Sequence, residues 1–86
     1  MPARDGARFR SLPFPVETTV RDGRLATLEI LEETDGGLVL HGFVWPVGVQ
    51  RFPARWRASG ECLDHDQSCA IDPDTTDVRE VLAFAR

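Results

Sequence analysis

The stretch "VETTVRDGRLATLEILEE", residues 16–33, decides the fold. Its first part is rich in β-branched residues, and Asp22 followed by Gly23 is a pair that favours a tight hairpin turn. Alternation of apolar and polar residues resumes after the turn, so the stretch predicts a β-hairpin. Because successive side chains of a strand point to opposite faces, we expect the interior side chains of the second strand to be Ala26, Leu28 and Ile30.

Two later segments have the patterns of further strands. Residues 38–45 are apolar on both faces, which is typical of a central strand, and Gly42 within them indicates a bulge or a bend. Residues 49–57 alternate, and Pro53 cannot donate a backbone hydrogen bond, which favours an edge strand or a bulge. The side chains of this segment that we expect in the core are Phe52, Ala54 and Trp56.

The C-terminal residues 72–86 change period. Apolar residues recur there at helical spacing, and Asp77 precedes Glu80 in the arrangement of a capping box, so we predict a short C-terminal helix. A strand is the alternative for residues 77–86, because "EVLAF" within them also alternates.

These elements together predict a mainly β fold of the α+β type. We expect a small bent antiparallel sheet or an SH3-like barrel of four to five strands, with the helix closing one end. Residues 1–15 contain several prolines and little periodicity, so we expect them to form a flexible N-terminal arm. Residues 16–86 are then a single β-rich domain.

The composition is that of a globular protein with an acidic balance. The longest apolar run is far too short to cross a bilayer, and no continuous apolar stretch follows the basic N-terminus, so we expect a cytoplasmic protein. The formal charge of −4 disfavours direct nucleic-acid binding as the main task. The charges are unevenly placed, because residues 51–60 carry three Arg and no acid whereas residues 61–86 carry seven acids and two Arg.

The stretch "GECLDHDQSC", residues 60–69, contains both cysteines and permits three interpretations. We favour an acidic recognition loop with a reduced thiol at each end. A disulfide closing this short segment is the second, and loop closure would stabilise the fold by about 2–3 kcal/mol. The third is tetrahedral zinc held by Cys62, His65 and Cys69 together with His41, although this spacing is unusual for a zinc site.

Two groups of charged side chains are candidates for contact with a partner. Alternate arginines of residues 51–57 project from one face of a strand, which suits phosphates or carboxylates; pairing with glutamates of the neighbouring strand is the alternative. Acids of the cysteine-containing loop form a second group, and Trp45 at a strand end could be an interface anchor or a core residue. The predicted partner-binding residues are Arg51, Arg55, Arg57, Trp45, Asp64, Asp66 and Asp72.

Motifs for catalysis do not occur in the sequence. It has no nucleophile elbow, no oxyanion-hole motif and no glycine-rich phosphate loop. We therefore expect neither enzymatic activity nor a cofactor.

The order "TVRDGRLATLEIL", "LVLHGFV", "RWRASGE" and "CAIDP" resembles a group of small uncharacterised proteins of phages and prophages that share an Arg-Asp-Gly-Arg hairpin. The resemblance covers roughly residues 19–73, and the cysteine-containing loop and the C-terminal segment depart from it. It implies an accessory protein of a mobile element, without enzymatic residues, that acts on host machinery.

The leading functional hypothesis is a non-enzymatic inhibitor of the anti-CRISPR kind, located in the cytoplasm of the host cell. It would occupy a surface of a larger host protein or ribonucleoprotein complex, with the acidic residues 61–77 in a cationic channel and the arginines at its rim. The alternative is a zinc-stabilised module that binds nucleic acid or regulates a partner, and a third possibility is pairing of an exposed β edge with a partner strand.

Overall fold

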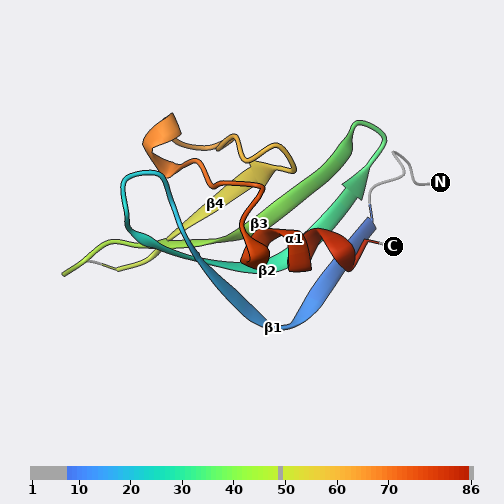
Figure 1. Cartoon of the computed structure of the whole chain (residues 1–86), viewed down its shortest axis with the longest axis horizontal. Helices are drawn as coiled ribbons and strands as arrows, with labels where there is room; N and C mark the ends of the chain where they lie inside the picture. The colour runs from blue at the N-terminus through green and yellow to red at the C-terminus, as the bar shows by residue number, and fades with distance from the viewer. Residues whose placement is uncertain (1–7, 49, 86) are drawn as a thin grey trace.

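The computed structural model describes residues 8–48 and 50–85, which form one antiparallel sheet and two helices (Figure 1). Strands adjacent in sequence are also adjacent in the sheet, so the chain is a meander of four strands. The elements are β1 (Arg8–Thr19), β2 (Leu25–Thr34), β3 (Gly37–Trp45), β4 (Phe52–Arg57), the 3-10 helix η1 (Gln67–Cys69) and α1 (Thr76–Ala83). The predicted mainly β fold class is confirmed. Of its two forms the structure shows the open sheet and not the barrel, because no described strand closes the sheet.

The hairpin between β1 and β2 turns where the sequence predicted. The N–H of Gly23 donates to the carbonyl of Val20 at 2.9 Å, and Gly23 has a φ of 96°, which glycine adopts without a steric penalty. The side chain of Asp22 accepts a hydrogen bond from the N–H of Arg24 at 3.1 Å and fixes the turn further.

A β-bulge in β2 corrects the predicted alternation. The register against β3 shifts between Leu28 and Ile30, so one extra residue, Glu29, stands in β2 at this point. Before the shift Leu28 is fully buried, and after it Leu31 occupies the interior whereas Ile30 is only half-buried. The prediction that Ile30 faces the core is therefore wrong, because a single added residue exchanges the two faces of a strand.

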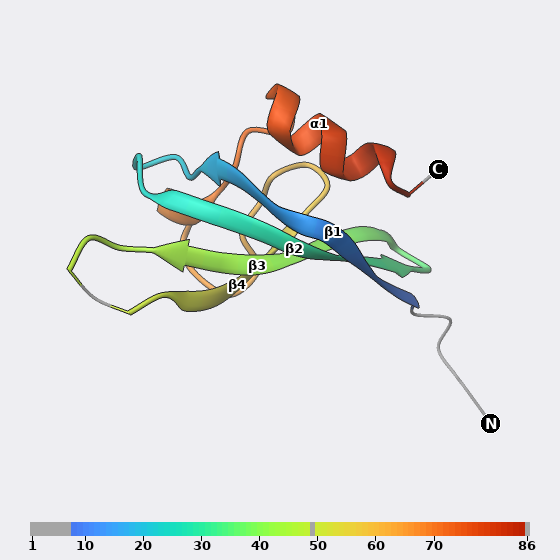
Figure 2. The same cartoon turned by 90° about the horizontal axis from the view of Figure 1, so that it is seen from below.

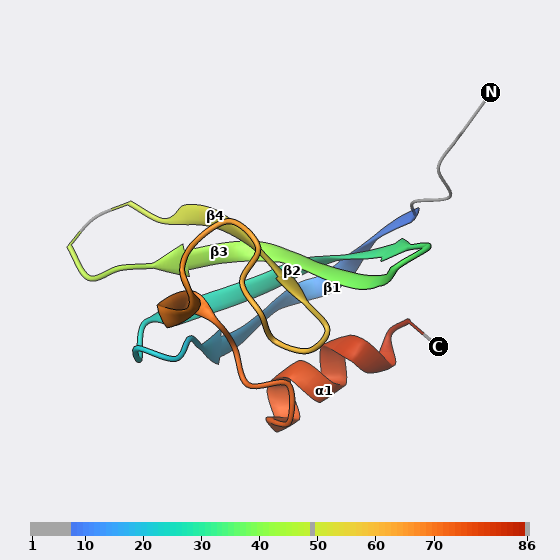
Figure 3. The same ribbon diagram turned by 90° about the horizontal axis from the view of Figure 1, so that it is seen from above.

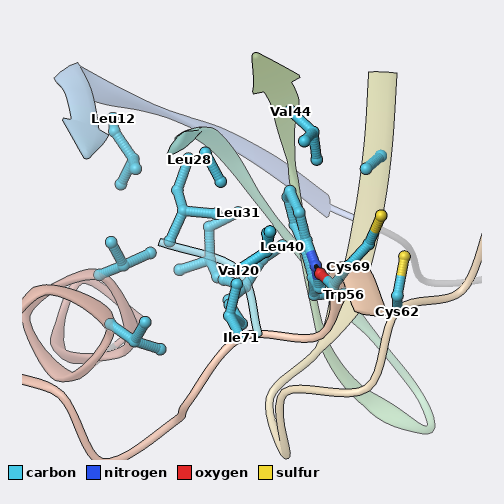
Figure 4. Packing of buried hydrophobic residues seen from close by; sticks show 14 residues of the cluster. Leu12, Val20, Leu28, Leu31, Leu40, Val44, Trp56, Cys62, Cys69 and Ile71 are labelled. Atoms are coloured by element: carbon cyan, nitrogen blue, oxygen red, sulfur yellow. Dashed lines mark hydrogen bonds between the residues drawn. The ribbon is translucent and has the colours of Figure 1, made fainter. Parts of the chain in front are cut away.

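One face of the sheet is covered by α1 and by residues 58–75. Figure 3 shows this segment crossing in front of the strands, and Figure 2 shows the sheet from its other side with the segment behind. We call the covered side the inner face. Its buried side chains include Leu12, Val20, Leu28, Leu31, Leu40, Val44, Ala54, Trp56, Cys62, Cys69, Ile71, Val78 and Val81 (Figure 4). Ala54 and Trp56 lie in the core as predicted, and Phe52 packs against it half-buried.

The two ends of the described chain differ in detail from the predictions. β1 begins at Arg8, inside the segment assigned to a flexible arm; its inner-facing Leu12 is buried, and the residues before Arg8 lie outside the described part. The C-terminal helix is present, but its N-cap is Thr75, whose hydroxyl accepts from the N–H of Val78 at 3.3 Å. The predicted capping box is wrong, and Asp77 lies instead in the first turn, where its charge favours the helix dipole.

Among the described residues, no helix is long and apolar enough to span a membrane.

The backbone of β2 just before the bulge lies so close to Gly42 of β3 that only glycine fits there, and a substitution can test this close approach. A Cβ atom at Gly42 would lie 1.8 Å from the carbonyl oxygen of Thr27, so Gly42→Ala should lower the free energy of unfolding by about 3 kcal/mol. Gly36→Ala is the matched control, because its Cβ would meet only one atom, at 3.8 Å, and its effect should stay within about 0.5 kcal/mol. Urea unfolding measures both, and equal stability of the two variants would contradict the close approach.

Candidate functional site

The side of the sheet opposite α1 is the candidate site, and we call it the outer face. No described helix or loop crosses it, as the view in Figure 2 shows. Strand alternation and register place on it a set of apolar and charged side chains: Phe9, Leu25, Ile30, Val39, His41, Phe43, Trp45, Pro53, Arg55 and Arg57. Phe9 is 65% exposed and Trp45 is 37% exposed, so large aromatic surface meets solvent there.

Trp45 is fixed in place by a chain of hydrogen bonds. Its indole N–H donates to the hydroxyl of Thr27 at 3.0 Å, and that hydroxyl donates to the carboxylate of Glu29 at 3.3 Å. Thr27 is buried although it points to the outer face, because the indole covers it. Of the two roles considered for Trp45, the structure thus supports a partly exposed, oriented ring outside the core.

Arg51 lies over two aromatic rings of β3. Its guanidinium carbon is 4.0 Å from the ring centre of Phe43 and 5.2 Å from that of Trp45, within the range of cation–π attraction. We call these three residues the Arg51 stack. Among the described residues Arg51 has no carboxylate partner, and its side chain is exposed.

The other two arginines of the predicted row are ion-paired. Arg55 makes a forked contact with Asp64, with distances of 2.8 Å from Nη2 and 3.1 Å from Nε. Arg57 pairs with Glu61 at 3.4 Å. The carboxylate partners of these two arginines lie in the segment after β4 and not in β2. The two predicted groups of charged side chains are therefore paired with each other at Arg55 and Arg57.

The remaining predicted acids shape that loop. Asp66 caps η1 by accepting from the N–H of Ser68 at 2.9 Å, and the hydrogen bonds from Ser68 hold the pKa of the Asp66 carboxyl below its usual range. Asp72 accepts from the N–H of Asp74 at 2.9 Å. The structure therefore places Asp66 and Asp72 in local turns and not beside the Arg51 stack.

Both thiols are free and buried, so the closing disulfide is not formed, and the recognition role of the loop stays a prediction. Cys69 Sγ accepts from Arg24 Nη2 at 3.2 Å, and the backbone of Cys62 bonds with the side-chain amide of Gln67 in both directions.

The two histidines have unrelated partners. His41 Nε2 lies 2.7 Å from a Glu32 oxygen, whereas His65 Nε2 lies 3.0 Å from the carbonyl oxygen of Pro53. The proposed zinc set is thus not assembled, and within residues 8–48 and 50–85 no three potential metal ligands cluster.

The chain matches no protein-family model, and neither the curated proteins nor the solved structures give a match. The resemblance to small phage proteins stays a prediction. The geometry of the outer face is therefore the basis for a functional assignment.

Sequence reasoning missed several residues of this face. Phe43 and Phe9 were not singled out, although alternation about the buried Val44 and Leu40 was a signal that could have placed Phe43 outward with Trp45. Nothing local indicated that Phe9 belongs to a strand and that its ring lies edge-on to His41 at 5.7 Å.

The contact between Arg55 and Asp64 predicts a pH-dependent stability. Hydrogen bonds from Arg55 hold the pKa of the Asp64 carboxyl below its usual range. The stabilisation is therefore complete above the unfolded-state pKa of about 4 and is lost as the pH falls through the lower folded-state value. Because both side chains are at least one-third exposed, Asp64→Asn should cost only about 0.5 kcal/mol at pH 7.

Thermal melts at pH 7 and near pH 2.5 test this, with Asp74→Asn as the control. The deficit of Asp64→Asn should become smaller at the lower pH, because protonation of the wild-type carboxyl removes the charge that Asn also lacks. A deficit of the same size at both values would contradict the charged contact.

The support of Trp45 by Thr27 gives a second test. Thr27→Val removes the acceptor of the indole N–H, so it should lower the free energy of unfolding by about 1 kcal/mol and speed hydrogen exchange of that N–H. NMR exchange and urea unfolding measure the two effects. Thr19→Val, at an exposed position of β1, should change neither; an unchanged exchange rate in Thr27→Val would rule out the hydrogen bond.

Proposed function

We propose that this chain is a non-enzymatic binding protein that recognises a partner protein through its outer face, with the Arg51 stack at the centre of the contact. The observation that carries the proposal is the contrast between the two sides of one sheet. The inner face is covered by α1 and residues 58–75, although Phe14 and Phe84 stay exposed beside α1, whereas the outer face has no such cover and leaves Phe9 and Trp45 in solvent. These two rings lie near opposite ends of β2, opposite Glu32 and Leu25, so aromatic surface is exposed along the length of the face, which is typical of protein interaction sites.

The composition and rigidity of the Arg51 stack support this role. Tryptophan and arginine are enriched among the residues that contribute most to binding free energy. Here Trp45 is held by Thr27, and Arg51 rests on Phe43 and Trp45. Because these side chains are ordered before a partner arrives, less conformational entropy is lost on binding.

The edges of the sheet are poorly suited to the alternative of strand pairing. The segment after β4 already occupies the edge of that strand, with the N–H of Leu63 donating to the carbonyl of Arg55 at 2.8 Å and that of Arg57 donating to Glu61 at 2.9 Å. At the opposite edge, β1 contains Pro13 and Pro15, which have no N–H to offer. A face of the sheet is thus better placed for a partner than either edge.

An anti-CRISPR-like inhibitor of a host complex is one form of this proposal, but its physical basis changes. Two acids of residues 61–77 are already paired with arginines of this chain, through Arg55–Asp64 and Arg57–Glu61. A cationic channel filled by the loop therefore has less support than a host protein surface that covers the aromatic side chains of the outer face.

Site-specific photocrosslinking tests the proposal in cells of the organism that encodes the chain. A photoreactive phenylalanine analogue is placed at Phe9 or Val47, which are 65% and 98% exposed, and for comparison at the exposed Arg79 of α1. The first two positions should give an adduct with the same protein, and Arg79 should give none. An adduct from Arg79 alone, or none from either Phe9 on the outer face or Val47 in the turn after β3, would refute the proposal.

The protein identified in this way is then purified and titrated with two matched variants. Trp45→Ala should weaken binding about tenfold or more, because a central interface tryptophan contributes strongly. Phe84→Ala on the C-terminal side of α1 removes an aromatic ring of nearly equal exposure, 38% against 37%, and should leave the affinity unchanged. Melting temperatures confirm that both variants are folded.

A further inference from the structure

We infer that the Arg51 stack is a carboxylate-binding site, and that the partner segment presents an aspartate or glutamate next to an apolar side chain. This inference rests on the proposed function and names the chemistry of the partner at that same surface.

The first support for a carboxylate ligand is the hydrogen-bonding capacity of Arg51. A guanidinium lying over aromatic rings keeps the N–H groups at its edge available, and those groups match the two oxygens of a carboxylate. Arg24, Arg55 and Arg57 each contact a carboxylate of this chain. Among the described residues Arg51 has no ion pair or side-chain hydrogen bond, and its guanidinium lies over the two rings, so its hydrogen-bonding capacity is open to a partner.

A recess next to the stack supplies the apolar half of the site. It has a volume of about 350 Å³, and Ile30, Phe43 and Pro53 form apolar parts of its lining. Phe43 belongs both to this lining and to the stack. A short partner segment can therefore place one apolar side chain in the recess while a neighbouring carboxylate reaches Arg51.

The charges around the recess favour a single carboxylate over a nucleic-acid strand. Glu29, Asp64 and Arg55 also line the recess, so two carboxylates face one guanidinium there, and the protein carries a formal charge of −4. A strand with one negative charge per phosphate would meet this repulsion along its whole length. A segment with one carboxylate between apolar groups brings a single negative charge to this surface, and the positive charge of Arg51 offsets the repulsion there.

NMR titration of the ¹⁵N-labelled full chain tests the inference with three probes. The probes are N-acetyl-Phe-Glu-amide, its neutral match N-acetyl-Phe-Gln-amide and an oligothymidylate. The Glu peptide should shift signals of Phe43, the Trp45 indole and Arg51, and should bind about fivefold more tightly than the Gln peptide. Arg51→Gln should abolish this ratio, Arg51→Lys should retain part of it, and Arg79→Gln, at an exposed position of α1 away from the outer face, should leave it intact.

Several results would overturn the inference and leave the proposed function to its own test. They are equal affinity of the two peptides, absence of shifts at the stack with either peptide at millimolar concentration, and tighter binding of the oligothymidylate than of the Glu peptide. Failure of the crosslinking pattern would instead remove the proposed function, whatever the peptide preference of Arg51.

Discussion

The placement of Trp56 is the constraint on which the rest of the structure depends. Its side chain is fully buried on the inner face, opposite Leu40 of β3, and its indole N–H donates to the carbonyl of Cys69 at 2.7 Å. A buried indole N–H without an acceptor is costly, so the chain after β4 must return across this face to supply one. Figure 4 shows the indole nitrogen beside Cys69, within the cluster that joins the sheet to the returning segment.

The outer face is left uncovered because residues 58–75 cross the inner face. Residues 58–75 and α1 together cover one side of a sheet of four strands, and little of the described chain is left to cover the other. The returning segment also brings Glu61 and Asp64 to the arginines of β4. Arg51 precedes β4, is paired with neither of these acids and lies over aromatic rings instead. The candidate site is thus a consequence of how the core is closed.

Much of the architecture could be predicted because it is encoded locally. The turn at Gly23, the edge position of Pro53 and the helical spacing after Thr75 each follow from the stereochemistry of a few neighbouring residues. The bulge at Glu29 could not be predicted in the same way. It adjusts the register of β2 against the neighbouring strand, and no pattern of adjacent residues in β2 marks its position. The partners of Arg55 and Arg57 depend on the path of the loop, which Trp56 determines, so sequence alone left them open.

Fluorescence of single-tryptophan variants tests this two-sided sheet most directly. Trp45→Phe leaves Trp56 as the reporter, and Trp56→Phe leaves Trp45, with circular dichroism to verify that both proteins are folded. We expect blue-shifted emission with little acrylamide quenching for Trp56, and red-shifted emission with several-fold stronger quenching for Trp45. Equal quenching of the two residues, or stronger quenching of Trp56, would contradict the buried inner face and the uncovered outer face together.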